Sequence, residues 1–190
     1  TVMEFINDQA RKKSIELARE RDPFPAWKGS MAETRGEEPL RNATRTTIAP
    51  TGTISIIAGC SSGIEPVFAL AYTRHVMDDD KLAEIHPLFC TELKKQKLYS
   101  KKLIKDITES GSVQEMKKLP DTIRSVYKTS HDISPEWHIR MQAAFQEYTD
   151  NAVSKTVNFP NSATISDVEH VYTLAHELDC KGVTIYRDGS

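Results

Sequence analysis

The sequence predicts an α/β fold that contains parallel strand–helix–strand units. A β-branched run at residues 155–159 is followed by a helical stretch and then by a second apolar run at 183–186. Two strands joined by a helix through short connections are parallel, and the crossover is right-handed. The composition, 38% hydrophobic and 27% charged, is ordinary for a globular domain. We therefore expect helices to cover one face of a parallel sheet.

The first part of the chain is predicted to contain one long helix, a loop and two short strands. Residues 2–20 repeat apolar or small side chains every three or four positions, as one helix face does. The prolines in 22–25 end that helix, because proline lacks an amide donor. Residues 29–39 are polar and are expected to form a long loop. Buried strands are expected at 45–49 and at 69–76.

The next part is expected to be mostly helical. Residues 81–128 are predicted to form helices that break near Gly111 and at Pro120. Ser134 followed by Pro135 predicts a helix N-terminus that the serine side chain caps. This helix carries one apolar stripe, formed by Trp137, Met141, Ala144 and Tyr148.

The helix between the two parallel strands also has a predicted start. Ser166 and Glu169 have the spacing of a capping box, in which each side chain bonds the other residue's backbone amide. The apolar stripe expected to face the sheet consists of Val168, Val171, Tyr172, Ala175 and Leu178.

Charge and cysteine content exclude several classes of protein. The net charge of −2 gives no basis for binding a nucleic-acid polymer. The basic residues at 94–102 lie among Glu92, Asp106 and Glu109, as on a solvated helix face. No apolar run approaches the ~18 residues of a membrane span, and no signal peptide is visible. The three cysteines, without a C-x-x-C pair, argue against disulfides and zinc and favour a reducing, cytoplasmic location.

One segment suggests chemistry. A predicted strand leads into Thr51, Gly52, Thr53, Ile54 and Ser55, where a glycine is flanked by three hydroxyl side chains before a short apolar stretch that could be helical. Free amides at a helix N-terminus attract anions, and glycine lets a ligand approach the backbone. The segment is therefore a candidate anion site. From the residues alone, a turn that only caps a helix is the favoured alternative.

The same segment resembles a known family. Residues 45–55, together with the Ser61-Ser62-Gly63-Ile64-Glu65-Pro66 run, resemble the phosphate-binding region of ribonucleotide reductase large chains, most of all the adenosylcobalamin-dependent class II enzymes. The segments 4–25, 154–160 and 181–190 resemble other parts of that family in the same order. This resemblance covers nearly the whole chain. It makes a phosphate-binding site, and not a turn that only caps a helix, the favoured interpretation of residues 51–55.

The resemblance implies a fold and an activity. Residues 1–190 would form the C-terminal portion of a ten-stranded α/β barrel that reduces ribonucleotides to deoxyribonucleotides by thiyl-radical chemistry. Adenosylcobalamin would generate the radical in the complete enzyme, without being held by this chain alone. Thr51, Gly52, Thr53, Ile54 and Ser55 would bind the substrate's phosphates, with Glu65 as an acid close behind them.

No catalytic residue is predicted in this chain. The family's radical cysteine lies in an N-x-C-x-E motif, and Cys60, Cys90 and Cys180 all lack that context, so we expect them to be buried small hydrophobic residues. No metal ligands are predicted either. The histidines lack ligand spacing and are expected at the surface or satisfied in the core.

Three functional hypotheses remain open at this point. The chain could be a portion of a reductase whose upstream half supplies the radical cysteine, since it begins at Thr1 rather than at a methionine. It could be a separately encoded subunit that completes a barrel, or a phosphate-binding module without redox activity. Half a barrel has unpaired strand edges, so we also expect a partner or self-association.

Overall fold

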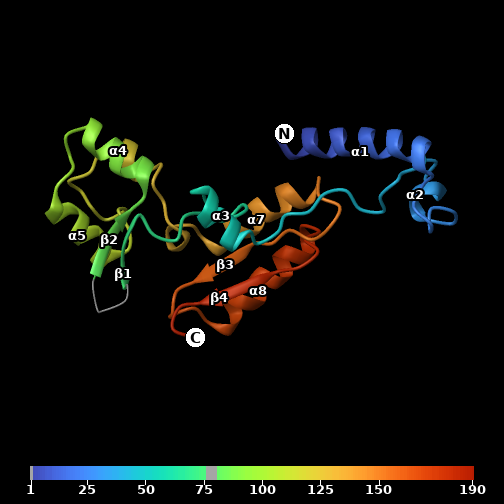
Figure 1. Ribbon diagram of the computed structural model, residues 1–190. Coiled ribbons are helices and arrows are strands. Elements are labelled where there is room, and N and C mark those ends of the chain that lie inside the picture. The colour runs from blue at the N-terminus through green and yellow to red at the C-terminus, as the bar shows by residue number, and fades with distance from the viewer. Residues whose placement is uncertain (1, 76–80) are drawn as a thin grey trace.

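The computed structural model of this chain describes residues 2–75 and 81–190. Helices α1 and α2 lie at one end of an elongated arrangement, and β1, β2, α4 and α5 lie at the other, with α3, α7, α8, β3 and β4 between them (Figure 1). The elements are α1 (Val2–Arg21), α2 (Met31–Thr34), α3 (Gly52–Ala58), β1 (Ala71–His75), β2 (Lys81–Ile85), α4 (Pro87–Lys95), α5 (Lys101–Ser110), α6 (Asp121–Arg124), the 3-10 helix η2 (Ser130–Asp132), α7 (Pro135–Gln146), β3 (Thr156–Phe159), α8 (Ile165–Glu177) and β4 (Thr184–Arg187).

The middle of the molecule is the predicted strand–helix–strand unit. Strands β3 and β4 are parallel, with Val157 opposite Ile185, and α8 connects them. Buried side chains from α7, β3 and α8 form their core, namely Ile139, Val157, Phe159, Val171 and Ala175. The predicted parallel pairing is confirmed.

The two helices of this unit begin differently from the prediction. Helix α8 starts at a capping box formed by Thr164 and Asp167, not by Ser166 and Glu169. Helix α7 starts after Ser134 as predicted, with Pro135 in its first turn, but the Ser134 side chain makes no capping hydrogen bond. Both helices are found, but neither is capped by the side chain that the sequence predicts.

Helix α7 turns its predicted apolar stripe outward. Trp137 is 65% exposed and Met141 is 50% exposed, whereas the buried residues of α7 are His138, Ile139, Gln142 and Gln146. The buried amide of Gln142 donates to the carbonyl of Gly182 at 2.5 Å, so this polar face ties α7 to the segment before β4.

The predicted strand at 45–49 is reduced to one bridge. Ile48 forms an isolated parallel bridge with Val153, and the amide of Ser154 donates to the Ile48 carbonyl at 2.8 Å. The prediction of a full strand is therefore wrong, because Pro50 removes an amide and Thr51 already turns away with a positive φ. The segment still runs beside the approach to β3.

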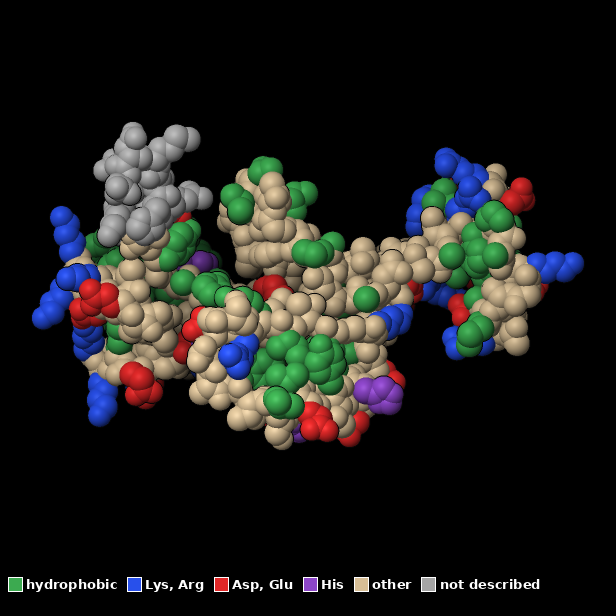
Figure 2. Space-filling view, turned by 90° about the horizontal axis from the view of Figure 1, so that it is seen from below, with side chains coloured by type: hydrophobic (Ala, Val, Ile, Leu, Met, Phe, Trp, Pro, Cys, Tyr) green, Lys and Arg blue, Asp and Glu red, His purple; other side chains and the backbone are tan. Residues whose placement is uncertain are grey.

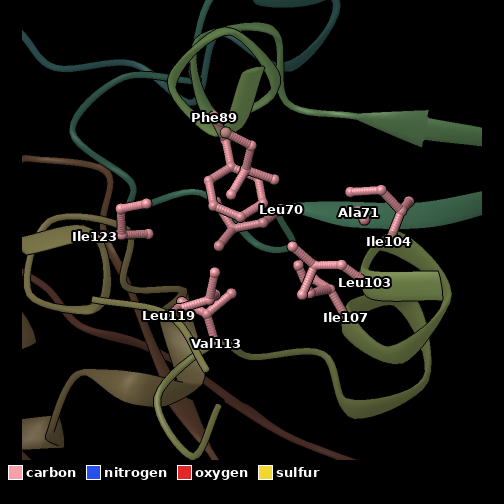
Figure 3. Packing of buried hydrophobic residues seen from close by; sticks show 10 residues of the cluster. Leu70, Ala71, Phe89, Leu103, Ile104, Ile107, Val113, Leu119 and Ile123 are labelled. Carbon is pink, nitrogen blue, oxygen red and sulfur yellow. The ribbon is translucent and has the colours of Figure 1, made fainter. Parts of the chain in front are cut away.

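The part around β1 and β2 has a separate core. β1 pairs with β2 in antiparallel register, Ala71 opposite Ile85, so the expectation of helix at 81–85 is wrong. The strand expected at 69–76 is found at 71–75, and residue 76 lies outside the described residues. Helix α5 ends before Gly111, as predicted. Figure 3 shows the buried side chains of this core pointing toward one another from the segment entering β1, from α4, α5 and α6 and from the loop after α5, among them Leu70, Phe89, Leu103, Ile107, Val113 and Ile123.

The N-terminal part consists of the predicted long helix and a short one. Met3 and Ser14 of α1 are buried as expected, but Ile6 is 45% exposed. The expected loop at 29–39 contains α2, which Ser30 caps by accepting from the Glu33 amide at 3.2 Å. The described helices include none that is long and apolar enough to span a membrane.

Candidate functional site

The candidate anion site lies at the N-terminus of α3. This helix begins at Gly52, directly after Thr51, whose φ of 53° is left-handed. The amide of Ser55 donates to the Thr51 carbonyl at 2.9 Å and closes the first turn. The amides before it, those of Gly52, Thr53 and Ile54, therefore have no acceptor inside the helix. They form a group of donors at the positive end of the helix dipole.

Gly52 keeps the approach to these amides open. A Cβ at Gly52 would meet no atom within 4 Å, and the φ of Gly52 is not left-handed. A side chain is thus compatible with the fold at this position, but it would occupy the space next to the free amides. Thr53 and Ile54 are exposed on the same short helix, with Ile54 at 64%.

Ser55 differs from its neighbours. Its hydroxyl donates to the Gly52 carbonyl at 2.7 Å, and the residue is 7% exposed. In this arrangement both donors of Ser55 are used within the helix. A direct bond from Ser55 to phosphate stays a prediction, and it requires the hydroxyl to leave Gly52.

The turn at Thr51 is fixed from the following loop. The amide of Gly63 donates to the Thr51 hydroxyl at 2.8 Å, and the hydroxyl of Ser62 donates to the Pro50 carbonyl. The left-handed conformation of a threonine costs about 1–2 kcal/mol. These bonds from residues 62 and 63 offset that cost and define where α3 begins.

Glu65 lies at the centre of a buried polar cluster, two residues after the Gly63 amide that holds the Thr51 turn. One carboxylate oxygen accepts from the Lys155 ammonium at 2.7 Å, and the other accepts from the Thr156 amide at 2.6 Å. The Lys155 ammonium also donates to Nδ1 of His138 at 2.8 Å and to the Thr156 carbonyl. The Lys155 side chain is 1% exposed, so its charge is almost completely removed from water.

The contacts of His138 define its protonation. Because a lysine ammonium donates to Nδ1, that nitrogen carries no proton, and Nε2 donates to the Ser130 carbonyl at 3.0 Å. Burial, and next the charge of Lys155, lower the pKa of His138. Burial also lowers the pKa of Lys155, which the Glu65 carboxylate opposes. The structure therefore holds a neutral imidazole beside an ion pair.

The sequence anticipated only part of this cluster. Glu65 was expected near the anion site, but Lys155 and His138 were not singled out. A lysine immediately before a buried β-branched strand is the signal that could have identified Lys155. His138 follows the expectation of a histidine satisfied in the core, whereas His131, His170 and His176 are exposed.

The cysteines contribute no reactive pair among the described residues. All three are free, and Cys90 and Cys180 are half-buried. Burial raises the pKa of the Cys180 thiol, which keeps it protonated and unreactive. Cys60 is exposed, so the expectation that it is buried is wrong. Residues 2–75 and 81–190 contain no group of three or more His, Cys, Asp or Glu side chains placed to hold a metal ion.

A comparison with known families matches nearly all of the chain. A family model described as "Ribonucleotide reductase, barrel domain" matches residues 1–186. A vitamin B12-dependent ribonucleoside-diphosphate reductase of Thermoplasma acidophilum is 49% identical over 189 residues, which cover 100% of this chain and 24% of that protein. A protein of the same name from Mycobacterium tuberculosis is 43% identical over 189 residues, covering 100% of this chain and 27% of its own length. The chain thus spans about a quarter of the length of these curated relatives.

A solved structure supports the fold. The Actinobacillus ureae class Id ribonucleotide reductase alpha subunit superposes with a TM-score of 0.78 and 24% sequence identity. The superposition covers 100% of this chain and 33% of that one. At this identity the likeness shows the fold alone, and it agrees with the predicted α/β class.

Proposed function

Because the chain belongs to the family of ribonucleotide reductase barrel domains, we propose that residues 1–190 form the C-terminal portion of the catalytic barrel of a reductase. The complete enzyme would convert ribonucleotides to deoxyribonucleotides for DNA synthesis in the cytoplasm. Its cofactor would be adenosylcobalamin, which supplies the radical when bound; the relatives named vitamin B12-dependent reductases support this assignment.

The role proposed for this portion is to bind the substrate's phosphate groups at residues 51–55. The observation that carries the proposal is the open N-terminus of α3, where the amides of Gly52, Thr53 and Ile54 lack acceptors within the helix. Gly52 leaves room for a phosphate next to them. Amides at a helix N-terminus and nearby hydroxyls are the usual protein ligands of phosphate.

The radical chemistry is proposed to come from elsewhere in the enzyme. No cobalamin site is proposed within this chain, where the buried His138 uses both ring nitrogens inside the protein. No cysteine has the N-x-C-x-E context. This portion would hold the nucleotide while another segment reacts with it.

The partner proposed for this chain is the upstream half of the same barrel. Support comes from β4, whose side chains are exposed or half-exposed although β3 beside it is buried. Among the described strands, β4 pairs with β3 alone and leaves its other edge open. A further parallel strand would cover that edge.

Binding at α3 can be tested by adding a side chain at Gly52. In the full-length reductase polypeptide, Gly52→Val should weaken binding of a ribonucleoside diphosphate by at least about tenfold, or ~1.4 kcal/mol, in isothermal titration. Gly182→Val is the matched control, because Gly182 also has an ordinary φ and open space around a Cβ. Equal affinity of the Gly52→Val variant and the parent would place the phosphate elsewhere.

The division of labour can be tested by activity. The isolated chain with adenosylcobalamin and a thiol reductant should give no deoxyribonucleotide, whereas the chain combined with the upstream half should give turnover. Turnover by the isolated chain would contradict the missing-cysteine argument. Nucleotide binding without turnover in the combined sample would favour a binding module without redox activity, and turnover from two separately expressed chains would be compatible with a barrel-completing subunit.

A further inference from the structure

We propose that Lys155, Glu65 and His138 are positioning residues for nucleotide binding, and that they act by fixing the turn from which α3 starts. Their side chains hydrogen-bond to one another and to the backbone of Ser130 and Thr156. The inference rests on the proposed phosphate role of α3. It adds a mechanism by which β3 and α7 control the geometry of that site.

The first support is that burying the Lys155–Glu65 ion pair adds little to the free energy of unfolding. Lys155 is 1% and Glu65 26% exposed at the side chain. Removing a buried ion pair from water costs much of what the attraction returns, and apolar residues of similar volume often stabilise as well or better. The pair therefore contributes little to stability that two apolar side chains of similar volume would not, whereas its directed hydrogen bonds fix the relative position of two segments.

The second support is the continuous set of bonds from this pair to Thr51. Glu65 fastens the loop to the start of β3 through Lys155 and the Thr156 amide. Two residues earlier, the Gly63 amide holds the Thr51 hydroxyl at 2.8 Å. Two residues later, the Val67 carbonyl accepts from the Ser130 amide at 2.9 Å. The loop is tied on both sides of Glu65, so a shift of Glu65 moves the Thr51 turn.

The third support is the placement of His138. Its Nδ1 accepts from Lys155, and its Nε2 donates to Ser130, the residue that also holds Val67. The charged or titratable groups near its ring are Lys155, Glu65 and His131. A proton on Nδ1 would remove one of the three acceptors of Lys155 and place a second cation beside it. Acidification should therefore loosen the loop and the α3 start.

The test uses the full-length reductase and separates positioning from folding. Lys155→Met, Glu65→Gln and the double variant are compared for KM and kcat with a ribonucleotide substrate. Each single variant should raise KM by at least about tenfold while kcat at saturation changes less than about twofold. The double variant should be no worse than either single one, because the two residues act on the same turn. Lys118→Met, which removes an ion pair with Asp106 near α5, is the control with unchanged kinetics.

A second readout is the pH profile of nucleotide affinity. Because burial lowers the pKa of His138 from its ordinary value of 6.5, the parent should lose affinity only at pH values below 6.5. His138→Asn keeps an acceptor for Lys155 but cannot take up a proton, so its affinity should match the parent near pH ~7.5 and stay constant on the acid side. If Lys155→Met fails to fold, this variant still tests the inference.

The outcomes distinguish this inference from the function on which it rests. If Gly52→Val abolishes nucleotide binding while Lys155→Met, Glu65→Gln and His138→Asn leave KM and its pH profile unchanged, the positioning role is wrong and the phosphate site stands. If Gly52→Val itself leaves binding intact, the phosphate site is wrong and the positioning role falls with it. A loss of kcat with constant KM would also overturn the positioning role.

Discussion

At the scale of single residues, Arg45 and Asp150 join segments 105 positions apart. Asp150 accepts from the Arg45 amide at 2.7 Å and from the Arg45 guanidinium at 2.9 and 2.8 Å. Burial alone would raise the pKa of Asp150, but these bonds outweigh it and lower the pKa. The pair holds the segment before α3 against the end of α7.

Asp150→Asn should reduce the free energy of unfolding by about 2 kcal/mol, because it removes charge-assisted bonds from a mostly buried guanidinium. Urea denaturation measures the change. Glu38→Gln, which breaks the exposed pair with Arg19, should change it by less than about 0.5 kcal/mol. Equal effects of the two variants would show that burial of the Arg45–Asp150 pair adds nothing to the free energy of unfolding beyond what an exposed pair contributes.

The pKa of His138 makes stability depend on pH. In the folded chain burial lowers this pKa below the ordinary value of 6.5, so the unfolded chain binds more protons between the two values. The free energy of unfolding should therefore fall as pH decreases below 6.5 and level off below the folded pKa. Urea denaturation at several pH values should show this slope in the parent and a smaller one in His138→Asn; an identical slope would assign it to other groups.

What the sequence could predict at this scale depended on the range of the contact. The free amides around Gly52 follow from local helix geometry, and the expected turn into a helix is found, although the helix begins at Gly52 and not at the apolar stretch after Ser55. The pairing of Glu65 with Lys155 spans 90 positions, and no local pattern encodes it. His138 was expected to be satisfied in the core, but its partner could be named only from the fold.

At the scale of elements, helix starts depend on which side chain caps them. Thr164 accepts from the Asp167 amide at 3.3 Å, and the Asp167 carboxylate accepts in return from the Thr164 amide at 2.7 Å. Ser166 lies two residues further on and is already the second helical residue of α8, so it cannot be the residue that caps the helix. The sequence contains both patterns two positions apart, and the path of the chain after β3 selects the earlier one.

Thr164→Ala should lower the free energy of unfolding by about 1 kcal/mol through loss of the cap. Ser166→Ala is the matched control and should change it little, since alanine has the higher helix propensity. Thermal or urea unfolding distinguishes the two. A larger loss from Ser166→Ala would restore the capping box expected from the sequence.

Strong periodicity predicted the elements of the middle part, and weak local signals failed elsewhere. The apolar alternation of β3 and four of the five predicted stripe residues of α8 face one core. The prediction is wrong for the fifth, Tyr172, which is 51% exposed. At 81–85 the sequence is compatible with a helix, but pairing with β1 makes it a strand. In α7 the apolar stripe predicts the wrong buried face. His138 and Gln142 are buried and satisfied by hydrogen bonds, whereas Trp137 is exposed.

At the scale of the whole molecule, the chain leaves much apolar surface uncovered. Figure 2 shows hydrophobic side chains gathered in a patch on the middle part. Large exposed apolar side chains include Ile54, Ile56 and Ile57 of α3 and Trp137 and Met141 of α7. Monomeric proteins rarely expose extended apolar patches, and the open edge of β4 adds unpaired backbone groups.

We predict that the isolated chain forms dimers or larger assemblies at micromolar concentration. Light scattering should show a mass above the 21.4 kDa of one chain. Changing both Ile56 and Ile57 to lysine should reduce the association without loss of stability, because they are 74% and 81% exposed. A monodisperse monomer of the parent chain would contradict the prediction.

Glu65 and Lys155 are 90 positions apart in the sequence, and this separation determines when their contact can form during synthesis. Forming this contact closes a loop of 90 residues, so β3 must exist before Glu65 can be fastened to it. A nascent chain that ends ahead of residue 155 already has the bonds from residues 62 and 63 to the Thr51 turn, but it lacks the Lys155 and Thr156 contacts that hold Glu65. The proposed positioning of the α3 start is therefore completed only after β3 has been synthesised.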